Sequence, residues 1–121
     1  MRSIIESIIG RRGSNTIRNT IREVPVRKEN LEGGDTVQLK SGKYRIFLVA
    51  DFNRNGMMRA GFYEDRYMCD ISHFDGSLEC DFDHDNDVVR IFKTSQLPNI
   101  SLKFPTYTGK ELEKIIKTGR A

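Results

Sequence analysis

Two alternating runs of apolar and polar residues flank the dipeptide Asp75-Gly76, and this arrangement constrains the fold more than any other feature of the chain. Asp-Gly favours a two-residue type I′ turn, because both central residues of that turn have positive φ. Such a turn predicts a β-hairpin that sets Ile71 opposite Cys80 and Cys69 opposite Phe82. The apolar side chains then all lie on one face, so the turn and the alternation predict the same register.

A second hairpin is predicted over residues 44–64. The run 44–52 ("YRIFLVADF") has apolar side chains on both faces, which is typical of a strand covered on both sides. The chain returns as "MMRAGFY" after residues 53–56, and a four-residue loop there sets Arg45 opposite Glu64. These opposite charges support the register, because cross-strand ion pairs stabilise neighbouring strands.

The stretch "DFNRNG" (51–56) also matches the first half of an EF-hand calcium loop. The twelfth position of that loop should be a bidentate Glu, but here it is Phe62, and the flanking residues alternate as strands do. We interpret the stretch as a hairpin turn in which Asn55-Gly56 supplies the positive φ values. The acidic run 83–87 lacks the glycine that a calcium loop needs, so the sequence predicts no metal and no cofactor.

A capping box begins a predicted helix near each end of the chain, with Ser3 and Glu6 in the first and Thr108 and Glu111 in the second. Each helix has an apolar side. The first carries Ile4, Ile5, Ile8 and Ile9, and the second carries Leu112, Ile115 and Ile116. Between them, Pro25 restricts any strand near it to a sheet edge. Further strands are predicted at residues 88–94 and 100–104.

The predicted fold class is mainly β, or α+β by count of elements. We expect a small antiparallel curled sheet, or an SH3/OB-like barrel, of five to six strands with a short helix at each terminus. The nine residues 34–42 ("GDTVQLKSG") resemble the opening strand of small SH3-like barrels. A chain of 121 residues has the size of one domain. Within it we distinguish a basic N-terminal helix and arm (1–30) from an antiparallel β domain with a C-terminal helix (31–121).

The net charge of +3 is unevenly distributed, since both ends of the chain are basic and residues 51–90 are acidic. Cys69 and Cys80 have neither CxxC nor zinc-site spacing, which predicts reduced thiols. No apolar run approaches the ~20 residues of a membrane span, and Glu6 interrupts the apolar N-terminal segment. We therefore expect a cytoplasmic protein that does not bind a membrane.

Aromatic and basic side chains alternate where the predicted strands begin: Tyr44 and Arg45 start one strand, and Arg66 and Tyr67 start another. Such a surface suits single-stranded nucleic acid, because bases stack on aromatic rings and basic side chains bind phosphate. We therefore predict a small non-catalytic nucleic-acid-binding module. Its predicted contact residues are Arg11, Arg12, Arg18, Arg22, Arg45, Arg59, Tyr63 and Arg66.

The acidic face of the predicted 67–83 hairpin supports a second hypothesis, a protein-interaction module that acts as an inhibitor or adaptor. Its register sets Asp70 opposite Asp81, and like charges across a ladder are destabilising unless a partner offsets them. The residues expected to contact a basic protein surface are Asp70, Glu79, Asp81 and Asp83. The Ile-rich N-terminal helix would also join copies into a homo-oligomer. Neither His73 nor His84 lies in a nucleophile motif, so we expect no enzyme.

Overall fold

The computed structural model describes residues 21–51, 58–64, 67–97, 100 and 107–119. The predicted N-terminal helix lies outside these residues. The predicted strand at 100–104 also lies outside them, apart from its first residue. The division of the chain after residue 30 stays a prediction.

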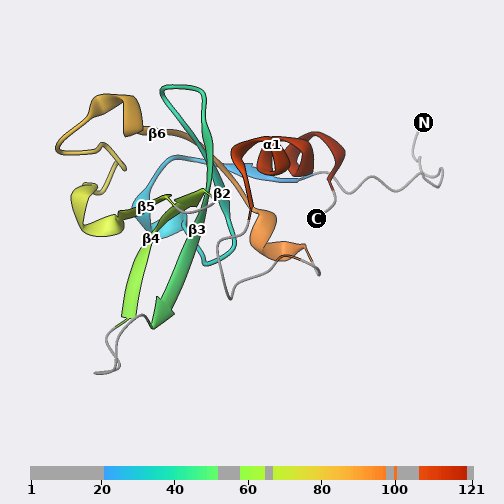
Figure 1. The fold of residues 1–121 in the computed structure, drawn as a ribbon, viewed down its shortest axis with the longest axis horizontal. Helices are drawn as coiled ribbons and strands as arrows, with labels where there is room; N and C mark the ends of the chain where they lie inside the picture. The colour runs from blue at the N-terminus through green and yellow to red at the C-terminus, as the bar shows by residue number, and fades with distance from the viewer. Residues whose placement is uncertain (1–20, 52–57, 65–66, 98–99, 101–106, 120–121) are drawn as a thin grey trace, which may run out of the picture.

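Six strands form one antiparallel sheet in the order β1-β6-β2-β3-β4-β5 (Figure 1). The strands are β1 (Glu23–Val24), β2 (Thr36–Leu39), β3 (Tyr44–Asp51), β4 (Met58–Glu64), β5 (Tyr67–Asp70) and β6 (Val88–Phe92). The helices are α1 (Gly109–Thr118) and the single 3₁₀ turns η1 (Lys28–Asn30), η2 (Ile71–His73), η3 (His84–Asn86) and η4 (Thr94–Gln96). The mainly β class is confirmed. A closed barrel is not, because β1 and β5 are the two edges of the sheet that the described strands form.

The predicted pairing of β3 with β4 is confirmed. Phe47 lies opposite Phe62 and Val49 opposite Ala60, which is the register that the four-residue loop implied. The ion pair that supported this register is also present. Asp51 pairs with Met58 at the end of the ladder, so strands and not helices flank the former EF-hand candidate, whose loop at 52–57 lies outside the described residues.

The sheet has an apolar core on each face, because β3 is apolar on both sides. On one face Ile46, Leu48 and Tyr63 pack beneath Leu112 and Ile115 of α1. On the other face, side chains from β3 to β5 pack against the segment between β5 and β6. This second core includes Phe47, Phe62, Cys69, Phe74, Leu78, Cys80 and Val88. Figure 1 shows α1 on one side of β3 and the β5–β6 segment on the other.

The predicted register of the 67–83 hairpin is wrong. β5 ends at Asp70 and pairs with β4, which sets Cys69 opposite Phe62, and Phe74 is the residue that bridges to Cys80. The turn is also different, because positive φ occurs at Leu78 (62°) and not at Gly76.

Two sets of contacts explain the different turn. The Asp75 Oδ1 atom accepts the N–H groups of Ser77 (2.9 Å) and Glu79 (3.0 Å). The Leu78 side chain is fully buried in the core. A type I turn followed by a residue with positive φ is a common hairpin connection. Here side-chain packing decides the turn, and the Asp-Gly preference does not.

Several local predictions are confirmed. β1, next to Pro25, is an edge strand. The Thr108 hydroxyl accepts the Glu111 N–H while the Glu111 carboxylate accepts the Thr108 N–H, so the capping box forms and α1 begins at Gly109. Cys69 and Cys80 are free, buried thiols.

Among the described helices, none combines the length and the apolar character that a membrane crossing requires.

Candidate functional site

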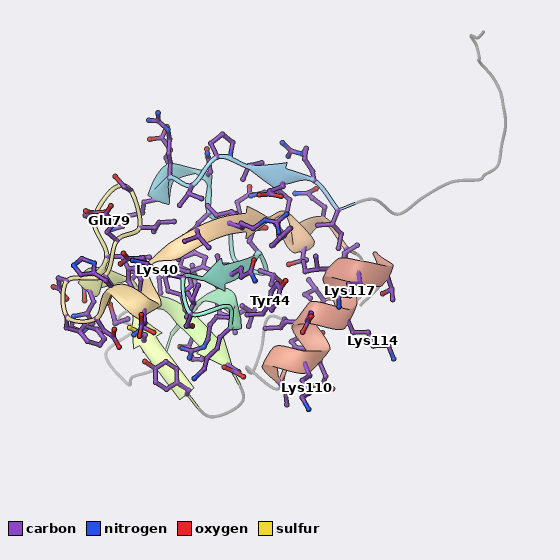
Figure 2. The ribbon with its side chains drawn as sticks, turned by 90° about the horizontal axis from the view of Figure 1, so that it is seen from above. Lys40, Tyr44, Glu79, Lys110, Lys114 and Lys117 are labelled. Atoms are coloured by element: carbon purple, nitrogen blue, oxygen red, sulfur yellow. The ribbon has the colours of Figure 1, made fainter. Side chains whose placement is uncertain are left out.

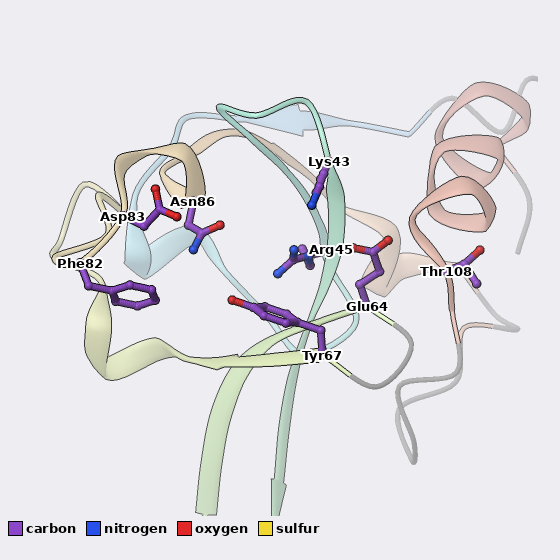
Figure 3. Close-up of a pocket in the computed structure, with 8 residues that line it drawn as sticks. All are labelled: Lys43, Arg45, Glu64, Tyr67, Phe82, Asp83, Asn86 and Thr108. Carbon is purple, nitrogen blue, oxygen red and sulfur yellow. Dashed lines mark hydrogen bonds and ion pairs between the residues drawn. The ribbon is translucent and has the colours of Figure 1, made fainter.

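An open groove of about 590 Å³ lies between the ends of β3, β4 and β5 and the loop that contains η3 (Figure 3). Its volume is within the range of small-ligand sites, which is roughly 300–1,000 Å³. The residues that line it are Lys43, Arg45, Glu64, Tyr67, Phe82, Asp83, Asn86 and Thr108. We refer to it as the Tyr67–Phe82 groove, after its two aromatic residues.

One row across three strands forms the base of the groove. The β-sheet register places Arg45, Glu64 and Tyr67 side by side on β3, β4 and β5. The Arg45 Nε atom lies 3.0 Å from Glu64 Oε1. The guanidinium carbon of Arg45 lies 4.0 Å from the centroid of the Tyr67 ring, a cation–π contact. Arg45 is also only 5% exposed. Its contacts with Glu64 and Tyr67 therefore hold its guanidinium in one position.

Glu64 also joins the groove to α1. Its second oxygen, Oε2, accepts the backbone N–H of Gly109 at 3.0 Å. A Cβ atom at Gly109 would lie 2.6 Å from that oxygen, so a residue without a side chain allows the approach. A carboxylate is favourable here, since the first N–H groups of a helix have no partner within the helix and carry partial positive charge. The groove and α1 therefore share one anchoring residue.

Two exposed aromatic rings line the groove. The exposed fractions are 43% for Tyr67 and 57% for Phe82, and both are among the large apolar side chains left accessible in the described residues. Figure 3 shows the Tyr67 hydroxyl directed towards the Phe82 ring. The His73 ring packs against the Phe82 ring edge to face, with ring centroids 5.0 Å apart. Exposed rings of this kind offer faces on which a planar ligand can stack.

The η3 loop brings polar groups to the same groove. The Asp83 Oδ1 atom accepts the Asp85 N–H at 3.0 Å and so begins η3. Asp87, at the end of η3, accepts the Cys80 N–H at 2.7 Å and lies 3.1 Å from His84 Nδ1. Burial raises the pKa of Asp87, but the hydrogen bonds from Cys80 and His84 outweigh it and the pKa is lowered overall. These bonds fix the loop that carries Asp83.

The predicted nucleic-acid contacts fall into three groups. Arg45 lies in the groove. Tyr63 does not, because it is 4% exposed and packs beneath α1 on the opposite face of the sheet. Arg22 is exposed beside β1, near the other edge of the sheet. The remaining predicted residues, or in the case of Arg59 its side chain, lie outside the described part of the chain: Arg11, Arg12, Arg18, Arg59 and Arg66.

The predicted acidic contacts do not form a ladder of facing charges. Asp70 ends β5 and accepts the Ser72 N–H at 2.9 Å, which begins η2. Asp81 instead lies beside His73, with its carboxylate 3.4 Å from Nδ1. Glu79 and Asp83 are exposed, and Asp83 lines the groove. The acidic side chains are therefore spread along the β5–β6 segment.

Two aromatic residues in the groove were absent from the predicted contact set. Tyr67 was part of the aromatic and basic pattern, and the strand pairing that set Arg45 opposite Glu64 could have placed it in the same row. Phe82 was expected on the buried face opposite Cys69. Its exposure follows from the turn at Leu78, for which the sequence has no clear local signal.

Charge is segregated on the described residues, in which Asp and Glu outnumber Lys and Arg. Figure 2 shows Glu79 on one side of the molecule and Lys110, Lys114 and Lys117 along α1 on the other. These lysines are separated by four and three residues, so they share one face of the helix. The acidic side is the β5–β6 segment next to the groove.

Neither the search for a metal site nor the comparisons with known proteins assign a function to the groove. Within the described part of the chain, no group of three or more His, Cys, Asp or Glu side chains is arranged to hold a metal ion. Comparisons with models of protein families, with curated proteins and with solved structures found no match. The groove and the charge distribution are therefore the basis for the functional argument.

Proposed function

We propose that this protein is a non-catalytic module that binds single-stranded nucleic acid in the Tyr67–Phe82 groove. The observation that carries the proposal is the pair of exposed aromatic rings beside the guanidinium of Arg45 and the ammonium of Lys43. Bases of a single strand can stack on such rings while basic groups contact phosphate. A duplex fits less well, because its bases are already stacked on one another and cannot reach the rings.

The charges in the groove make stacking the main source of affinity there. Lys43 and Arg45 are offset by Glu64 and Asp83 among the lining residues. Among the α1 lysines, Lys110 is the proposed phosphate contact, because it follows Thr108, which lines the end of the groove. The basic N-terminal residues Arg11, Arg12, Arg18 and Arg22 are a further proposed source. A share of the affinity should therefore depend on salt.

Fluorescence anisotropy with short labelled DNA and RNA oligonucleotides tests the proposal. Tyr67→Ala and Phe82→Ala should each weaken binding by about 1–3 kcal/mol, the usual contribution of stacking one base. Val89→Ala is the matched control, since Val89 is 45% exposed on β6 and does not line the groove. Affinity should also fall as salt rises. The proposal fails if no oligonucleotide binds, or if the three variants behave alike.

A basic protein surface is the second candidate partner. Phe82 lies exposed between Asp81 and Asp83, and the Asp81 side chain is 67% exposed. Exposed aromatic residues often dominate protein interfaces, and flanking acids would select a basic partner. Glu79→Lys with Asp81→Lys discriminates between the two hypotheses. The double variant should lose a basic protein partner, whereas its affinity for an oligonucleotide should rise because two negative charges beside the groove become positive.

The proposal also includes a compartment and an oligomeric state. We place it in the cytoplasm, a site supported by the free thiols of Cys69 and Cys80, because cysteines stay reduced in that compartment. A homo-oligomer formed through the Ile-rich N-terminal helix stays a prediction. Sedimentation of the full chain and of a chain without residues 1–20 would test it.

A further inference from the structure

The side chains beside Phe82 point to a specific base, and we propose that the groove recognises guanine through Asp83 and Asn86. This inference rests on the proposed binding of single-stranded nucleic acid and names the base that the groove prefers. Asp83 follows Phe82 in the chain, and both line the groove with Asn86. In Figure 3 Asp83 and Asn86 lie next to each other above the Phe82 ring. A base stacked on Phe82 would therefore direct its edge towards these two side chains.

Asp83 offers hydrogen-bond acceptors that the protein does not use fully. Its Oδ1 atom accepts the Asp85 N–H, and Oδ2 has no partner among the described residues. An ionised carboxylate has about four lone-pair sites on its two oxygens, so most of its accepting capacity remains. The bond from Asp85 also fixes the orientation of the carboxylate. The group is thus positioned before a ligand arrives.

Asn86 offers a donor at the same place. Its side chain is half-buried, lines the groove and makes no hydrogen bond with the described residues. The side-chain polar atoms of Asn86 are not fully buried, so its carboxamide stays accessible and can bond a ligand in the groove. A ligand that accepts a hydrogen bond from Asn86 and donates hydrogen bonds to Asp83 would satisfy both side chains.

Guanine is the base whose edge fits this arrangement. Its Watson–Crick edge presents two adjacent donors, N1–H and the N2 amino group, followed by the O6 acceptor. The donors match the two oxygens of a carboxylate, and charge-assisted pairs of this kind are the strong ones. Adenine and cytosine place an acceptor beside a single amino donor. Thymine and uracil place one donor between two carbonyl oxygens. A carboxylate facing these other edges would meet at least one oxygen or ring nitrogen that is itself an acceptor and carries partial negative charge.

The rest of the groove can accommodate the remainder of a nucleotide. Tyr67 provides a second exposed ring for the neighbouring base. Lys43 lines the groove and is exposed, so its ammonium is available for a phosphate. The volume of about 590 Å³ leaves room for these groups beside the base. Arg45 has a different role, since its bonds to Glu64 and Tyr67 hold Tyr67 in place.

The test measures binding of thymine oligonucleotides that carry one central guanine, adenine, cytosine or thymine. A single guanine in this context also avoids the four-stranded structures that guanine runs form. We expect the guanine oligonucleotide to bind about 5- to 100-fold more tightly, the usual range for one specific base contact. Hypoxanthine in place of guanine lacks the N2 amino group and should lose much of that preference.

Two variants of the same loop make the test specific. Asp83→Asn should remove the guanine preference, so that the guanine and all-thymine oligonucleotides bind with similar affinity. Asn is also a good residue for beginning a helical turn, so η3 should persist. Asp85→Asn is the control, because Asp85 is exposed in the same loop and does not line the groove. It removes the same charge and should keep the preference.

The outcomes separate this inference from the function on which it rests. If all four oligonucleotides bind equally and Tyr67→Ala weakens them all, the binding function stands and guanine recognition is overturned. If none binds, both are overturned. If the guanine preference survives in Asp83→Asn, the assignment of the reading residue is overturned even though the groove binds guanine.

Discussion

The carboxylate of Glu64 accepts the backbone N–H of Gly109 at 3.0 Å, and this contact connects strand β4 to the first residue of helix α1. The other oxygen of the same carboxylate lies 3.0 Å from Arg45 Nε. Arg45 in turn lies against the ring of Tyr67. One side chain therefore fixes the start of the helix that covers one core and the cation at the base of the groove on the opposite face.

Glu64→Gln should lower the free energy of unfolding by about 2 kcal/mol, because it leaves a nearly buried guanidinium without an opposite charge. The Arg45 side chain is 6% exposed and that of Glu64 28%. Urea denaturation followed by circular dichroism measures the change. Glu113→Gln is the matched control. It removes an exposed pair with Lys117 on α1 and should cost about 0.5 kcal/mol or less. Equal losses in the two variants would contradict the anchoring role of Glu64.

The sequence predicted the β3–β4 pairing and the α1 capping box because each depends on nearby residues that agree with one another. Apolar side chains on both faces of β3 indicate a central strand. A one-residue slip of β4 against β3 would move every side chain of β4 to the opposite face of the sheet. The Arg45–Glu64 pair adds a second constraint on the same register. The capping box needs only Thr108 and Glu111, three residues apart.

The position of the β5–β6 segment could not be predicted in the same way. The Asp-Gly turn preference and the alternation agreed, but both are local, and burial of Phe74 and Leu78 in the core outweighs them. Phe74 contacts Phe62 edge to face, with ring centroids 4.8 Å apart. Because this packing shifts the bridge to Phe74 and Cys80, Phe82 becomes exposed. That half of the groove is therefore a tertiary feature, whereas Arg45 could be placed from strand register.

Gly61→Ala should destabilise the protein, and Gly76→Ala should not. A Cβ atom at Gly61 in β4 would lie 2.6 Å from the Cys69 carbonyl oxygen of β5, and backbone atoms cannot move away without disturbing the ladder. We expect a loss of about 1–3 kcal/mol. At Gly76 no atom lies within 4 Å of the added Cβ and φ is not positive. Alanine there should be neutral or stabilise by about 0.4–1 kcal/mol.

Thermal and urea unfolding of the two alanine variants would also test whether the turn is the observed one, with positive φ at Leu78, or a type I′ turn with positive φ at Gly76. A type I′ turn requires positive φ at its glycine, so Gly76→Ala would then be strained and destabilising. A loss at Gly76 that equals the loss at Gly61 would contradict both the geometry of the turn and the assignment of positive φ to Leu78.

Lys93→Met should be strongly destabilising at neutral pH. Lys93 Nζ lies 2.6 Å from a carboxylate oxygen of Asp35, which is fully buried, and 3.0 Å from Glu32. Removing the ammonium leaves the Asp35 charge uncompensated, at a cost of about 3–5 kcal/mol. Lys117→Met, which breaks an exposed pair, is the control and should cost little. Urea unfolding at pH 7 measures both.

The same lysine should make stability fall at high pH. Burial lowers the pKa of Lys93, but the hydrogen bonds to Asp35 and Glu32 raise it more, so the pKa lies above its ordinary value of 10.5. A group with a raised pKa contributes fully below the unfolded value and loses its contribution as pH rises through the folded value. Stability of the native protein should therefore decrease more steeply above about pH 10.5 than that of Lys93→Met. Parallel curves would contradict the role of this ion pair.

Asp87→Asn should flatten the loss of stability in acid. The hydrogen bonds from Cys80 and His84 hold the pKa of Asp87 below its ordinary value of 3.8, although burial acts in the opposite direction. A carboxyl group with a lowered pKa contributes stability above its unfolded value and loses that contribution as pH falls through the folded value. Asn keeps the acceptor for the Cys80 N–H and removes only the charge. The free energy of unfolding of the native protein should thus fall more steeply below about pH 4 than that of Asp87→Asn.

Thermal melts between about pH 2.5 and 7 measure this difference, with Asp85→Asn as the control because Asp85 is exposed in the same loop. The control should follow the native curve.

The charge of Asp87 should also affect the groove, since the bond from Cys80 to Asp87 holds the loop that carries Phe82 and Asp83. Acid that protonates Asp87 should therefore loosen the groove before the sheet unfolds, seen as a loss of oligonucleotide affinity at a pH where the circular dichroism spectrum is unchanged. If oligonucleotide affinity and the circular dichroism spectrum are lost at the same pH, Asp87 stabilises the whole fold and does not act on the groove alone.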